Sequence, residues 1–139
     1  MRVPALLVIA SALVSCTMAP PPPGYAAAQA AQEQAAFQKA LAGRVPAGRP
    51  VACLPHYATN DTVNLSENTI LFRQGGTTYV NHPPGGCPGL NNGFYVLVTR
   101  SVGGQLCRGD IANVADISNH MIVGTCTMGD FIPYRRPGA

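Results

Sequence analysis

From residue 51 onward, short runs of apolar and β-branched residues alternate with clusters of Gly, Pro and Asn. Two such runs, at residues 69–74 and 77–81, are separated by a Gly-Gly pair. This connection favours a β-hairpin, because glycine adopts the positive φ values that tight hairpin turns require. In that register Phe72 faces Tyr79, and such cross-strand pairs stabilise an antiparallel sheet.

Further runs predict the rest of a small β domain. The continuous apolar run at residues 94–98 is typical of a strand covered on both faces. Shorter runs predict strands at residues 106–107, 111–115, 121–126 and 131–132. About six short strands with turns every 8–12 residues are typical of a small antiparallel β-sandwich or partly open barrel. We therefore expect a mainly β head over residues 51–134.

The chain before the head has a different composition. Four prolines at residues 20–23 favour polyproline II, which would serve as a spacer. Residues 25–43 are rich in Ala and Gln and predict a helix, with a low-complexity tether as the alternative. Residues 44–50 contain Pro and Gly and are typical of a linker. The basic tail at residues 135–139 is expected to be a solvated terminus.

Residues 1–15 have the pattern of an export signal. Arg2 precedes an apolar stretch, and Leu-Val-Ser then leads directly into Cys16. The segment resembles a bacterial lipoprotein signal with its lipobox, which implies cleavage before Cys16 and attachment of diacylglycerol to its sulfur. The alternative is an ordinary secretory signal followed by a chance cysteine. The resemblance implies a membrane anchor at Cys16, and Thr17 after it suggests the outer membrane, with the head facing the periplasm or the cell surface.

The four cysteines beyond Cys16 predict two disulfides, because an exported chain enters an oxidising compartment. Three pairings are possible. We favour Cys53–Cys126, which would join the ends of the head, and Cys87–Cys107, which would pin a loop to the strand after the central one. The rival is a zinc site, but no two of these cysteines have the close spacing that structural zinc sites favour. We expect no metal and no cofactor.

Three short motifs in the head carry a family resemblance. They are Cys-Pro-Gly-Leu at residues 87–90, Leu-Cys followed by Asp-Ile-x-x-Val at 106–114, and Cys-x-x-Gly-x-Phe-x-Pro at 126–133. Together they resemble a family of small proteobacterial exported and lipoprotein domains of unknown function. The resemblance implies a scaffold held by disulfides and implies no activity.

Charge and side-chain chemistry exclude several classes of function. Only 11% of the residues are charged and the net charge is +3, which is too weak and scattered for a nucleic-acid binder. The three histidines adjoin turn residues, and no partner for a general base is obvious close to them in sequence. No serine lies in a Gly-x-Ser-x-Gly elbow, and no aspartates have calcium-loop spacing. We therefore expect no enzyme.

The prediction that remains is an envelope lipoprotein with a structural or protein-interaction role. One alternative is a periplasmic module that binds a small ligand or a glycan, with stacking surfaces supplied by Tyr57, Tyr79, Tyr95 and Tyr134. The other is an inhibitor-like lipoprotein that blocks an envelope hydrolase with the loop at residues 82–92. The candidate interaction residues of that loop are His82, Pro83, Pro84, Pro88 and Leu90.

Overall fold

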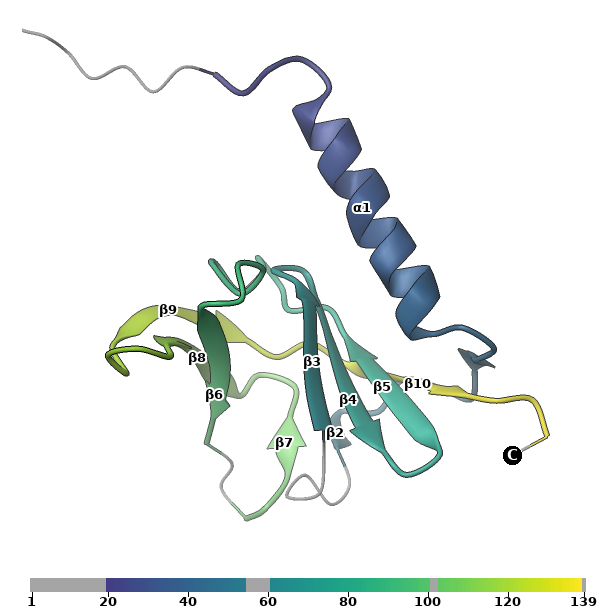
Figure 1. Cartoon of the computed structure of the whole chain (residues 1–139). Helices are drawn as coiled ribbons and strands as arrows, with labels where there is room; N and C mark the ends of the chain where they lie inside the picture. The colour runs from purple at the N-terminus through teal and green to yellow at the C-terminus, as the bar shows by residue number, and fades with distance from the viewer. Residues whose placement is uncertain (1–19, 55–60, 101–102, 139) are drawn as a thin grey trace, which may run out of the picture.

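The computed structural model describes residues 20–54, 61–100 and 103–138. Within these residues one helix precedes ten antiparallel strands (Figure 1). The elements are α1 (Tyr25–Ala40), β1 (Val45–Pro46), β2 (Cys53–Leu54), β3 (Asp61–Ser66), β4 (Thr69–Gln74), β5 (Thr77–Asn81), β6 (Tyr95–Thr99), β7 (Leu106–Cys107), β8 (Ile111–Asp116), β9 (Ile122–Thr127) and β10 (Phe131–Arg135). The expected mainly β fold with a preceding Ala-rich helix is confirmed.

The largest sheet has five strands in the order β1-β10-β5-β4-β3 and is open, with β1 and β3 at its edges. Its centre is the predicted hairpin. Gly75 has a φ of 54°, and Phe72 pairs with Tyr79 in the register that the Gly-Gly turn predicts. Because successive residues of a strand point to opposite faces, this hairpin contributes to two separate apolar clusters.

The main core lies on one face of this sheet. Phe72 and Phe131 pack there edge to face, with their ring centroids 5.6 Å apart. The two smaller sheets close over them: β2-β7 supplies Leu54 and Leu106, and β6-β8-β9 supplies Val114. These side chains are completely buried, so the three sheets share one apolar core.

A second cluster lies on the other face of the large sheet, under the end of α1. Leu41, just after the helix, is buried against Leu71 and Val80. Phe37 packs with them and meets the ring of Tyr134 edge to face at 6.3 Å between centroids. The helix has no fully buried residue of its own, and in Figure 1 it rises away from the sheet toward its N-terminal end. Only its last turns are therefore held by packing.

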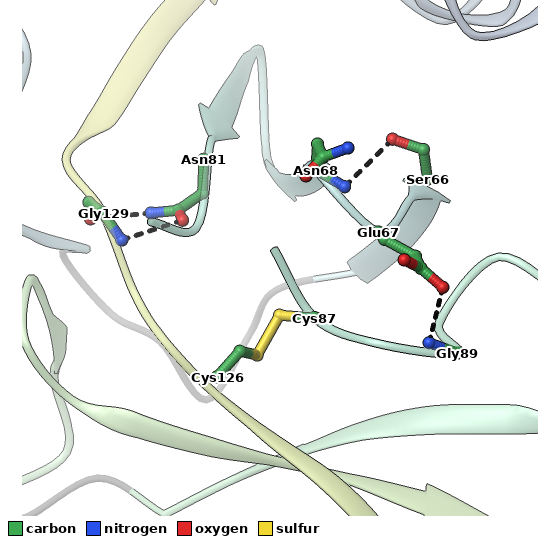
Figure 2. The surroundings of a disulfide bond; sticks show 8 residues. All are labelled: Ser66, Glu67, Asn68, Asn81, Cys87, Gly89, Cys126 and Gly129. Atoms are coloured by element: carbon green, nitrogen blue, oxygen red, sulfur yellow. Dashed lines mark hydrogen bonds between the residues drawn. A yellow bond between two sulfur atoms is a disulfide. The ribbon is translucent and has the colours of Figure 1, made fainter. Parts of the chain in front are cut away.

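The disulfides differ from the favoured pairing. Cys53 is bonded to Cys107, and Cys87 is bonded to Cys126. The prediction of Cys53–Cys126 and Cys87–Cys107 is wrong, because β2 pairs with β7 and places Cys53 directly opposite Cys107. The loop that carries Cys87 instead packs against β9, where Cys126 lies (Figure 2). The expectation that all four cysteines form two disulfides is confirmed.

The number of strands also needs correction, from about six to ten within the described residues. The two-residue strands β1 and β2 are too short to produce a hydrophobic period. The strand β3 carries Asp, Thr, Asn and Ser at four of its six positions and so lacks the apolar signal. At the other end, β10 continues through Pro133, whose carbonyl accepts a hydrogen bond of 2.8 Å from the backbone N–H of Ala47.

Candidate functional site

The outer face of the β6-β8-β9 sheet is the largest concentration of exposed apolar side chains in the described structure. On β8, Ala112 and Val114 point into the core, so Asn113 and Ala115 point outward. On β6, Leu97 packs against the core. The alternate positions Val96 and Val98 are 42% and 39% exposed. The sequence-based expectation that this strand is covered on both faces is therefore wrong.

The strand register aligns these outward residues in rows. Val96 of β6 lies opposite Ala115 of β8, which lies opposite Ile122 of β9. The next row contains Val98 and Asn113. A shift in the β8–β9 register accompanies these rows, since Val114 pairs with Gly124 while Ala115 pairs with Ile122. The rows line an open groove of about 340 Å³, which Ile117 of the following turn extends.

Other large apolar side chains of this sheet and its connecting turns are also exposed. Phe94 is 69% exposed, Ile111 is 65% exposed and Met121 is 64% exposed. Ile122, at the edge of the sheet, is 60% exposed. Contiguous apolar surface of this kind on a folded protein marks an interaction site more often than scattered exposed residues do. We call the surface formed by the groove and these residues the apolar face.

Two charged residues lie at opposite ends of the groove. Arg100 directly follows the last residue of β6, whereas Asp116 pairs with Tyr95, the first residue of β6. The Asp116 carboxylate accepts hydrogen bonds from the Ser118 hydroxyl at 2.5 Å and from the Ser118 backbone N–H at 2.7 Å. These bonds, with smaller contributions from the Asn119 N–H and from His120, lower the pKa of Asp116 below its ordinary value. The groove therefore carries Arg100 at one end and the Asp116 carboxylate, with His120 beside it, at the other.

The loop of residues 82–92 is folded against the body of the protein, and its largest aliphatic side chain is buried. Leu90 is only 2% exposed and belongs to the main core. The Glu67 carbonyl accepts a 2.7 Å hydrogen bond from the Cys87 N–H, and the Glu67 carboxylate accepts a 2.7 Å bond from the Gly89 N–H (Figure 2). Of the remaining candidate residues, Pro83 is buried, while His82, Pro84 and Pro88 are exposed.

The structure does not gather the candidate tyrosines on one surface. Tyr79 is buried in the main core and Tyr95 packs against it, whereas Tyr134 lies in the second cluster beside α1. Tyr57 lies outside the described residues, as do His56, Cys16 and the whole predicted signal. The three described tyrosines therefore provide no common stacking platform.

The remaining chemistry-bearing residues have structural partners. His82 lies with Nδ1 3.0 Å from the carbonyl oxygen of Asn68. The Asp110 carboxylate accepts a 2.7 Å hydrogen bond from the Cys107 N–H and so stabilises the turn at residues 107–110. Asp130 instead forms an ion pair with Arg108 at 3.1 Å. In the described part of the chain no group of three or more His, Cys, Asp or Glu is placed to hold a metal ion.

A second hollow, of about 560 Å³, lies between α1 and β3. Amide, phenol and carboxylate groups contribute much of its lining, including those of Gln29, Gln32, Asn91, Tyr25 and Glu33. It is wide because the helix is packed only at its C-terminal end. This hollow brings together none of the candidate site residues.

Comparisons with protein-family models, with curated proteins and with solved structures find no match to this chain. No helix in the described residues is long and apolar enough to cross a membrane. The apolar face is the candidate site that the structure adds to the sequence-based candidates. Its signal was present in the apolar run at residues 94–98 and in residues 121–123, but the period alone does not say which strand face is covered.

Proposed function

We propose that this protein is a lipid-anchored component of the bacterial cell envelope whose β head binds another protein through the apolar face. The anchor is Cys16, and the chain between it and the packed C-terminal end of α1 forms the spacer between the membrane and the head. The observation that carries the interaction role is the apolar face itself. There, exposed side chains of β6, of β9 and of the turn after β8 line one groove.

The two disulfides support an oxidising compartment such as the periplasm or the cell surface. A processed lipoprotein cysteine carries two or three acyl chains, and two or more chains hold a protein stably on a bilayer. In cells fed an alkyne analogue of palmitate, the wild-type chain should acquire the label, and Cys16→Ser should abolish it. Thr17→Ser is the matched control and should retain the label. An unlabelled wild-type chain would exclude the anchor.

The apolar face favours protein interaction over the two alternative roles. The glycan-binding alternative relied on stacking by the candidate tyrosines, whereas Tyr79 is buried and Tyr134 packs against Phe37. An inhibitory loop needs a projecting side chain, whereas Leu90 is buried. The partner chemistry that fits the face is an apolar protein surface, since the fully buried core of a protein interface is more apolar than its polar rim.

Photo-cross-linking of the full chain in its own envelope tests this role. A photoreactive amino acid at Ile122 lies on the apolar face, and one at Val45, which is 48% exposed on β1, is the matched control. We expect a discrete protein adduct from position 122 and none from position 45. Failure to form any protein adduct at position 122 would exclude the proposed interaction.

A further inference from the structure

We propose that the partner bound by the apolar face is a second copy of this chain, related by a two-fold axis that crosses β6 at a right angle. This inference rests on the proposed interaction role and specifies the occupant of the groove. The decisive observation is the charge pattern: the groove has Arg100 at one end of β6 and Asp116 at the other.

The two charges are separated by the length of β6, which is about 17 Å for five residues at about 3.4 Å each. A two-fold axis that lies between two facing sheets and crosses the strands reverses the strand direction of the second copy. Arg100 of each copy then lies over the end of the groove that carries Asp116 of the other copy. The contact is made twice, as in any isologous interface. A two-fold axis parallel to the strands would instead place Arg100 over Arg100.

The uncharged rows of the face are also self-complementary in this arrangement. The axis passes over the middle row, so the carboxamide of Asn113 lies near its own copy, and an amide can donate to and accept from another amide. The axis places the row that contains Ile122 over the row of the other copy that contains Ile111, the first residue of β8. Both side chains are largely exposed in the single chain, and the contact would remove them from water.

The size of the sheet sets the expected strength of the contact. The three strands span about 14 Å at about 4.8 Å per strand. The two facing sheets would form a small sandwich, with about 10 Å between the sheets. Such an area lies below that of stable specific interfaces and in the range of weak, transient contacts, which predicts a weakly associating, reversible dimer. Confinement to a membrane surface by the anchor raises the effective concentration of the two heads and compensates for the small area.

The same cross-linking experiment distinguishes this inference from the proposed function. We expect the adduct from position 122 of the full chain to have twice the mass of one chain and to contain peptides of this chain alone. An adduct with a different protein would overturn the second-copy inference while leaving the interaction role intact. An adduct with lipid only, or no adduct, would overturn both.

A charge exchange tests the orientation independently of folding defects. Two full-length chains with different tags carry Arg100→Glu and Asp116→Lys. Each variant alone places like charges together at both contacts, and we expect about a tenfold or greater loss of self-adduct. Co-expression of the two variants restores opposite charges at both contacts, so the adduct between the tags should return to near the wild-type yield. Absence of rescue, with both variants folded by circular dichroism, would overturn the proposed two-fold arrangement.

Discussion

The side chain of Asn81 and the backbone of Gly129 are joined by two reciprocal hydrogen bonds, although 48 residues separate them. The Asn81 amide donates to the Gly129 carbonyl at 2.8 Å, and the Gly129 N–H donates to the Asn81 side-chain oxygen at 3.1 Å (Figure 2). Asn81 is completely buried, so these bonds replace water that the amide cannot reach. The pair joins the end of β5 to the turn before β10.

Replacement of Asn81 by Leu should lower the free energy of unfolding by about 3 kcal/mol, because the buried N–H and carbonyl of Gly129 would lose their partner. Urea unfolding followed by circular dichroism measures the change. Gln38→Leu, at an exposed position of α1, is the control and should change stability by less than about 0.5 kcal/mol. Equal effects from the two substitutions would contradict the role of the Asn81–Gly129 pair.

The position of Gly129 also excludes any larger side chain. A Cβ atom there would lie 2.5 Å from the backbone carbonyl oxygen of His82, which cannot move independently of the chain. Gly129→Ala should therefore destabilise the protein by about 2 kcal/mol or more. Gly76→Ala is the matched control, since no atom lies within 4 Å of its added Cβ. If both variants unfold at the same urea concentration as the wild type, the close approach does not constrain residue 129.

The two disulfides should differ in their rate of reduction. Cys87 is buried and Cys126 nearly so, whereas both Cys53 and Cys107 are partly exposed. Because thiol exchange requires access to a sulfur atom, Cys53–Cys107 should open first in dilute dithiothreitol. Timed alkylation and peptide mass spectrometry of the full chain measure the order. Prior reduction of Cys87–Cys126 would contradict this prediction.

Loss of either disulfide should lower stability substantially. The bonds close loops with sequence separations of 54 and 39 residues. In the chain-entropy account each loop contributes about 4 kcal/mol. Paired Cys→Ser replacements, compared with wild type by urea unfolding, measure each contribution. A paired variant as stable as the wild type would show that its bond adds nothing to the fold.

The lowered pKa of Asp116 predicts a contribution to stability that depends on pH. The folded state favours the carboxylate, chiefly through the Ser118 hydroxyl, so the contribution is present above the unfolded pKa near 3.8. It should decline as the pH falls from there through the lower folded pKa. Carbon-detected NMR titration should give a midpoint for Asp116 below its ordinary value of 3.8, and Ser118→Ala should raise it. An unchanged midpoint in that variant would exclude the hydroxyl as the cause.

The sequence predicted the elements whose signals are local. The hairpin follows from the Gly-Gly pair between two apolar runs, and α1 follows from its alanines. The sequence did not predict β2, because two residues have no period and their pairing partner is β7, where Cys107 lies 54 residues beyond Cys53. The disulfide pairing depends on the same long-range contact. Cys53 bonds to Cys107 because β2 pairs with β7, and nothing near Cys53 in sequence indicates this.

The apolar face was missed for a related reason. An apolar run indicates that a strand can be covered on both faces, but the second cover must come from another element. For the β4–β5 hairpin that cover is the C-terminal end of α1, which packs against Leu71 and Val80. The helix lies far from β6 in Figure 1, and Val96 and Val98 remain open to solvent in the single chain.

A hairpin covered on both faces has a consequence for folding. A slip of one residue between β4 and β5 would exchange the side chains on the two faces, and both arrangements would still bury apolar groups. Hydrophobicity therefore discriminates poorly between the correct hairpin and its slipped form. Asn81 distinguishes the native register from the slipped one, because only the native register places its amide against Gly129. In the slipped hairpin the amide would be buried among apolar side chains without a hydrogen-bond partner. We infer that this single polar side chain protects the chain from a kinetic trap.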